Sequence, residues 1–254
     1  MLIAAAVCPH PPLLVPEVTG VSGPGARALR RLRAACREAV AALLAGHPDL
    51  LAVVGGADRT GEHPAATAGS LREFGVPYPG GEDAAGPALP LSLTVAKWLI
   101  GEAAPTAPPV AWWGIASGAA TADCLDLGEK LAGLAPRVAL LAMGDGPGRQ
   151  ARGVPGGEDP AARRYDDQVA AALAAADPDA LAALAARQDR ELAVAGRAAW
   201  QVLAGAASSA GAGPGGSTGA GPGAFAADLR YAAAPFEVSY FVASWRRTAP
   251  PEAH

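Results

Sequence analysis

The feature that most constrains the fold is a short apolar run that stops at a dense group of prolines. Residues Leu2 to Val7 are all apolar and have the length of a buried β-strand. The next nine residues, Cys8 to Pro16, include four prolines. Proline fixes φ and has no backbone donor, so this segment is expected to join neither a helix nor a sheet ladder. We therefore predict a strand followed by one rigid, extended loop, with His10 at their junction.

His10 has two interpretations on the residues alone. Open α/β sheets bind their ligands at the carboxyl ends of the strands, which is where this imidazole would lie. Alternatively, the ring forms a local hydrogen bond that braces a rigid loop. Both interpretations remain open at this point.

The spacing of apolar residues predicts alternating helices and strands along the rest of the chain. Residues 26–45 show helical spacing, and five arginines occupy the remaining faces, which indicates a solvated surface. Further strands are predicted at 50–54, 110–116, 138–143, 225–233 and 238–245, and further helices at 91–100, 121–134, 160–175, 178–186 and 189–206. Because the strands at 2–7 and 50–54 are continuously apolar, both faces of the sheet should be covered. We predict an α/β fold of three layers, with a central mixed sheet flanked by helices.

The domain organisation follows from length and from one low-complexity segment. The 254 residues suffice for one large domain. Residues 207–223 consist of Gly, Ala, Ser and Pro almost throughout, which predicts a flexible segment. Only two strands follow it, and two strands alone are not stable. We therefore predict a single domain over residues 1–254 with a flexible insertion at about 207–223.

Composition excludes several classes of protein. A formal charge of −4 gives no basic field for nucleic acid. No window approaches a membrane span free of Gly, Pro or charge, and the first residues lack a basic secretory n-region. The three cysteines are far apart and odd in number, which argues against a disulfide framework and a CxxC zinc site. These features favour a soluble, cytoplasmic protein without a nucleic-acid or membrane partner.

Three further side chains are candidates for chemistry. His63 lies in the long loop after the second predicted strand, on the same expected sheet edge as His10. Glu237 is flanked by apolar residues at a strand start, and is either a buried acid that is paired or metal-bound or an exposed edge residue. Asp145 follows the fourth strand within Gly144–Gly148 and is a candidate catalytic carboxylate. The glycines around it either cradle an anion with their N–H groups or simply turn the chain.

Three segments resemble class III extradiol ring-opening dioxygenases, in particular the small LigB-like proteins related to the catalytic subunit of protocatechuate 4,5-dioxygenase. These segments are Val7–Glu17 (VCPHPPLLVPE), Met143–Gly146 (MGDG) and Pro235–Trp245 (PFEVSYFVASW). The resemblance spans nearly the whole chain in order. It implies a single α/β domain with a non-haem Fe(II) held by two histidines and one glutamate. It also implies a catecholic substrate, O₂, and a further histidine that acts as acid and base.

The resemblance transfers only in part to this chain. His10 matches the first metal histidine, and Glu237 stands near the C-terminal glutamate. The second metal histidine is expected just after the second strand, where Asp58 or His63 could take its place. The acid/base histidine is expected near the loop after the fourth strand, but residues 144–150 contain none.

Two hypotheses follow from this partial match. In the first, the protein is an Fe(II)-dependent extradiol dioxygenase with metal ligands His10, Glu237 and either His63 or Asp58. In the second, it is a catalytically inactive homologue of the LigB or Memo kind that binds a small molecule or a protein in the same cleft. Both hypotheses are compatible with a homo-oligomer.

Overall fold

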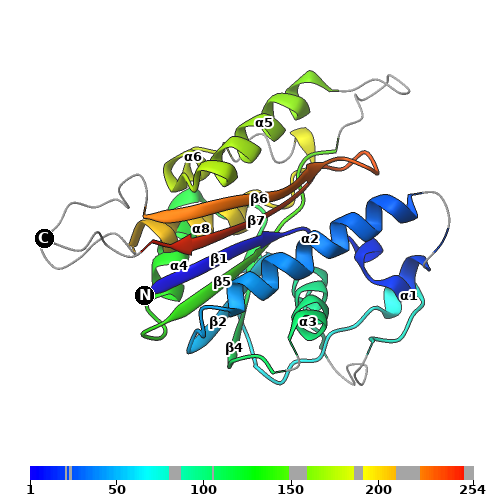
Figure 1. Ribbon diagram of the computed structural model, residues 1–254, viewed down its shortest axis with the longest axis horizontal. Coiled ribbons are helices and arrows are strands. Elements are labelled where there is room, and N and C mark those ends of the chain that lie inside the picture. The colour runs from blue at the N-terminus through cyan, green and yellow to red at the C-terminus, as the bar shows by residue number, and fades with distance from the viewer. Residues whose placement is uncertain are drawn as a thin grey trace, which may run out of the picture.

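The fold is a seven-stranded mixed sheet with helices on both faces, so the predicted fold class is confirmed (Figure 1). The computed structural model describes residues 1–20, 22, 25–79, 87–104, 106–148, 159–185, 191–209 and 224–248. The strands are β1 Leu2–Cys8, β2 Leu50–Ala57, β3 Gly61–His63, β4 Val110–Ala116, β5 Val138–Met143, β6 Phe225–Ala233 and β7 Tyr240–Arg247. The helices are α1 Pro16–Thr19, α2 Ala26–Leu44, α3 Leu91–Ala103, α4 Thr121–Ala132, α5 Pro160–Ala175, α6 Pro178–Ala182 and α8 Arg197–Ser209. Short 3₁₀ turns occupy Pro12–Leu14 and Arg72–Phe74.

The strand order β3-β4-β2-β5-β1-β7-β6 brings four parallel strands together in the centre. β4, β2, β5 and β1 pair in parallel, whereas β3, β7 and β6 pair antiparallel with their neighbours. The carboxyl ends of the four parallel strands therefore meet at one edge of the sheet. This is the edge at which α/β proteins bind ligands.

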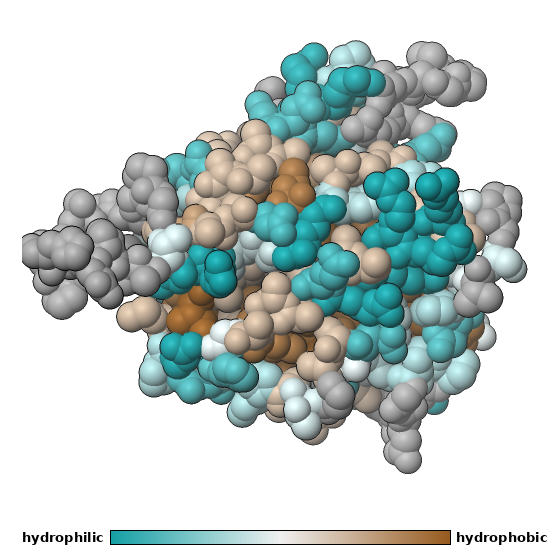
Figure 2. All heavy atoms as spheres, in the orientation of Figure 1, coloured by the Kyte–Doolittle hydropathy of each residue, from teal (hydrophilic) through white to brown (hydrophobic). Residues whose placement is uncertain are grey.

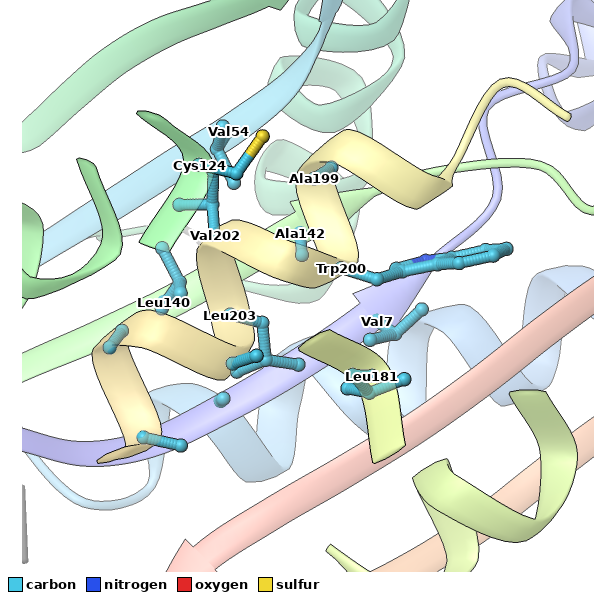
Figure 3. Close-up of a cluster of buried hydrophobic side chains, with 14 of the residues drawn as sticks. Val7, Val54, Cys124, Leu140, Ala142, Leu181, Ala199, Trp200, Val202 and Leu203 are labelled. Atoms are coloured by element: carbon cyan, nitrogen blue, oxygen red, sulfur yellow. The ribbon is translucent and has the colours of Figure 1, made fainter. Parts of the chain in front are cut away.

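Alternate residues of the strands pack against different helical layers, as the period of a strand requires. Ala6 and Cys8 belong to the core beneath α2 and α3, whereas Ala5 and Val7 belong to the core on the opposite face. On that opposite face, α8 lies across the sheet with Trp200, Val202 and Leu203 among the strand residues (Figure 3). The continuously apolar strands are thus explained by a sheet that is covered on both sides.

α2 has one apolar side in the core and one charged side at the surface. Its buried residues include Leu29, Leu32, Cys36 and Val40, at the helical spacing read from the sequence. The space-filling view shows hydrophilic side chains gathered over this helix (Figure 2). Of its five arginines, Arg33 alone is half-buried and the others are exposed, so a solvated face is confirmed for four of them.

The proline-rich segment differs from the expectation. Pro12 begins a 3₁₀ turn and Pro16 begins α1, whereas we predicted an extended loop without helix. The physical reason is that the first helical position needs no backbone N–H, so proline is well suited to start a helical turn. Arg33 fastens this segment from α2: its Nε donates to the Leu14 carbonyl at 2.6 Å and its Nη2 to that of Leu13 at 3.0 Å.

Several boundaries differ from the sequence prediction. The helix predicted at 189–206 is α8, Arg197–Ser209, and the strand predicted at 238–245 is β7, Tyr240–Arg247. The helix predicted at 178–186 ends at Ala182, and the one predicted at 91–100 continues to Ala103. β2 does not stop at Gly55 but continues to Ala57. A Cβ on Gly55 would lie 2.5 Å from Ser92 Oγ, so this glycine permits close packing of α3 and makes no turn. Residues 207–209 of the expected insertion belong to α8, and residues 210–223 lie outside the described part of the chain. Within the described part, no helix is both long and apolar enough to span a membrane.

Candidate functional site

His10 lies just beyond the carboxyl end of β1 and is held there by Asp145, which follows the neighbouring strand β5. Asp145 Oδ1 accepts a hydrogen bond from the His10 backbone N–H at 2.8 Å and lies 3.7 Å from His10 Nδ1. Both side chains are largely buried, with exposed fractions of 12% and 16%. The Nδ1 atom of His10 is buried and forms no hydrogen bond within the described residues.

The loop that carries Asp145 is fixed by its own backbone. The N–H groups of Gly144, Gly146 and Gly148 donate to the carbonyls of Cys8, Ser239 and Leu192 at 2.9, 2.7 and 3.1 Å. Because these donors are already used by the protein, the interpretation of this loop as an anion cradle is wrong. The loop instead holds the carboxylate of Asp145 in one place beside His10.

The negative charge of Asp145 raises the pKa of two neighbouring side chains, Cys36 and Tyr240. Burial, a hydrogen bond to Cys8 and the negative charge of Asp145 raise the pKa of the Cys36 thiol well above its ordinary value. Burial and, second, Asp145 raise the pKa of Tyr240 to about 12. Both groups are therefore neutral at physiological pH, and Cys36 is not activated as a nucleophile.

His63 reaches the same edge of the sheet through the short strand β3. β3 folds back antiparallel onto β4 and places His63 opposite Trp112. Its Nε2 lies only 3.1 Å from where a Cβ on Gly114 would be, so the absent side chain of this glycine makes room for the imidazole. The sequence contains no signal for β3, because its three residues carry no apolar alternation.

The two histidines line one cleft of about 820 Å³ at the carboxyl edge of the parallel strands. Its polar lining consists of His10, Asp58, Arg59, His63, Glu73 and Ser117. Its apolar lining includes Pro90 and Leu91 at the start of α3. The expectation that His10, Asp58 and His63 share one sheet edge therefore agrees with the structure.

Glu237 lies elsewhere. It occupies the turn between β6 and β7 at φ 62°, is exposed, and lines a separate cavity of about 380 Å³ together with Asp159 and Glu191. The residue of this segment that is buried is Ser239, whose hydroxyl donates to Asp166 Oδ2 at 2.6 Å. The apolar neighbours of Glu237 in the sequence thus belong to a turn beside a buried strand. Of the two interpretations of Glu237, the exposed position is the one that the structure shows.

The metal set implied by the resemblance is not assembled. His10 and His63 line one cleft and Glu237 another cavity. Among the residues that the structure describes, no three His, Cys, Asp or Glu side chains are arranged to hold a metal ion. The donor set therefore does not fit an iron bound by two histidines and one carboxylate.

Three polar residues of the cleft were not predicted from the sequence. Ser117 and Arg59 follow β4 and β2 closely, so the rule that ligands bind at carboxyl ends of strands could have found them. Glu73 lies in the 3₁₀ turn of a long connection, and only tertiary packing brings it to the cleft.

Comparisons with known proteins give a likeness in structure but no family. No protein-family model matches the chain, and no curated protein matches it. The chain is similar to the crystal structure of an uncharacterized protein, JW3007, from Escherichia coli K12. The match covers 95% of this chain and 99% of that chain, with 15% sequence identity and a TM-score of 0.47. A likeness of this degree assigns neither family nor function.

Proposed function

We propose that the protein is a catalytically inactive homologue of the LigB-like extradiol dioxygenases that binds a small, catechol-like molecule. The binding site is the cleft between His10 and His63. One observation carries the proposal: these two imidazoles line the same cleft, whereas Glu237 lines another. The cleft lies at the sheet edge that the resemblance implies, and Glu237, the carboxylate that the resemblance implies for iron, does not line it.

The cleft has the size and the chemistry for such a ligand. Its volume of about 820 Å³ lies in the range of small-molecule sites. Pro90 and Leu91 offer apolar surface to an aromatic ring, and the carboxylates of Asp58 and Glu73 accept hydrogen bonds from hydroxyl groups. The hydrogen bond from the His10 backbone N–H to Asp145 fixes the backbone that carries this imidazole, which lowers the ordering cost of binding.

The test is ligand binding without turnover. Calorimetric titration with catechol should give a saturable signal, and an oxygen electrode should record no catechol-dependent O₂ uptake after anaerobic loading with Fe(II). His63→Ala should weaken catechol binding by roughly tenfold, because a hydrogen bond to a charged or polar group contributes about 1–2 kcal/mol. Glu237→Gln is the matched control and should bind as wild type, because this side chain lines a different cavity.

Two results would overturn the proposal. One is catechol binding that Glu237→Gln abolishes and His63→Ala leaves intact. The other is stoichiometric Fe(II) binding that depends on His10 and His63, together with O₂ uptake and ring cleavage. The second result would identify the protein as an extradiol dioxygenase, with Asp58 as the first residue to test for the missing carboxylate.

A further inference from the structure

We propose that the exposed arginine face of α2 is a docking surface for an acidic segment of a partner protein. This face, which we call the arginine face, consists of Arg27, Arg30, Arg31 and Arg37. All four side chains are exposed, and their helical positions place them on one side of α2. The opposite side of the helix is in the core. The arginine face lies over α2 in the hydrophilic region of Figure 2.

The charge of the arginine face is not neutralised within the described residues. None of its four guanidinium groups forms an ion pair there, and the single acid of the helix, Glu38, pairs with Arg230 at 3.4 Å. Five arginines and one glutamate give α2 a formal charge of +4. The whole chain carries −4, so the remainder carries −8. The positive charge is therefore concentrated on this helix.

The arginine face does not serve the stability of its own helix. Three of its residues lie in the first two turns, where the helix dipole already presents positive charge, and the first turn contains no acid. Arg27 and Arg31 are four residues apart, a spacing at which like charges repel. Carboxylates of a partner would relieve both effects.

The surroundings of the arginine face favour a protein segment over other polyanions. Single-stranded nucleic acid binds on exposed aromatic side chains, and a membrane-surface helix inserts its apolar side into the lipid. The large apolar side chains that are exposed in the described structure are Met1 and Leu134, and neither belongs to α2. The remainder of the chain, at −8, also repels a long polyanion. A short acidic segment meets only the local positive field, and carboxylates match the guanidinium fork.

The experiment uses the full chain and a fluorescein-labelled peptide rich in Glu and Asp. Ten residues of helix separate Arg27 from Arg37, or about 15 Å, so a peptide of about 12 residues spans the face. Fluorescence anisotropy should show binding that weakens steeply with added salt. Arg27→Glu/Arg31→Glu should reduce the affinity about tenfold or more. These substitutions place acids near the helix N-terminus, where they favour the helix, so the fold is retained.

The control is Arg164→Glu/Arg246→Glu, which changes the net charge equally at exposed positions on other elements. This control should keep near wild-type affinity. An equal loss in both double variants would show a net-charge effect and overturn the proposal, as would undiminished binding by Arg27→Glu/Arg31→Glu. The proposal also fails if wild type does not bind the peptide, or if it binds a poly-U oligonucleotide or phosphatidylserine vesicles in its place.

Discussion

Gly128 of α4 is the point at which the packing of α4 against α8 can be tested most directly. α4 and α8 cross so closely that a Cβ on Gly128 would lie 2.0 Å from the Val202 carbonyl oxygen and 2.6 Å from the Ala206 nitrogen. Gly205 of α8 faces the same crossing, where its Cβ would lie 2.1 Å from the Leu125 carbonyl oxygen. All these obstacles are backbone atoms, so no side-chain rotation can relieve them.

The magnitude for Gly128→Ala follows from this geometry. Ordinary contact begins at 3.4 Å, so the helices must separate by about 1.4 Å at the crossing. Overpacking of this kind costs about 1–3 kcal/mol, and rigid backbone on both sides places the cost at the upper end. Alanine has a higher helix propensity than glycine, which stabilises the helix by about 1 kcal/mol. We expect a net loss of about 2 kcal/mol in the free energy of unfolding.

The matched control is Gly101→Ala in α3. This glycine is exposed, and its Cβ would meet no atom within 4 Å. It should therefore gain about 0.5–1 kcal/mol from propensity alone. Urea unfolding followed by tryptophan fluorescence compares the two variants with wild type, and thermal scans should show Gly128→Ala lower by about 4–8 °C. If Gly128→Ala is as stable as Gly101→Ala, the close crossing of α4 and α8 is wrong.

Three further predictions concern the cleft and the buried groups beside it. Gly114→Ala should weaken catechol binding by about tenfold, because its Cβ would lie 2.8 Å from Ala57 Cβ and 3.1 Å from His63 Nε2, and both residues line the cleft; calorimetric affinity equal to wild type would contradict this. Cys36 should resist a thiol reagent at about pH 8 until urea unfolds the protein, since its raised pKa and burial keep it neutral; rapid labelling of the folded protein at Cys36 would contradict this. Tyr240 has a pKa of about 12 when folded and about 10 when unfolded, so its contribution to stability is present below about pH 10 and is lost as the pH rises toward 12. Urea midpoints of wild type should therefore fall more steeply over this range than those of Tyr240→Phe, and parallel declines would refute the shift.

The position of the cleft also links the stability of α8 to the proposed function. Arg197, at the start of α8 and fully buried, donates from Nη2 to the carbonyls of Ser117 and Ala119 at 2.8 and 3.0 Å. Ser117 lines the cleft. Displacement of α8 by Gly128→Ala should therefore disturb ligand binding as well as stability.

The local pattern of apolar residues was sufficient for most of the secondary structure. β4, β5, β6 and α5 have the predicted bounds. β4 and β5 are continuous apolar segments, and α5 has helical spacing and begins at Pro160. The unbroken apolar strands also determined that the sheet is covered on both faces. Predictions failed where a residue type has two uses: proline starts helical turns at Pro12 and Pro16, and Gly55 makes room for Ser92 within a strand.

The sequence by itself determined which residues stand at the ends of strands, and this was enough to place His10, Asp58 and Asp145 at one edge. Tertiary structure alone decided which distant side chains share a cleft. His63 joins His10 because the three-residue strand β3 pairs with β4 beside Gly114, and Glu237 is separated because its turn has a left-handed backbone and faces another cavity. Strand periodicity is a local property, so it can be read from residues that are neighbours in the sequence. Convergence of side chains depends on pairing and close approach between segments far apart in the chain, which no local pattern contains.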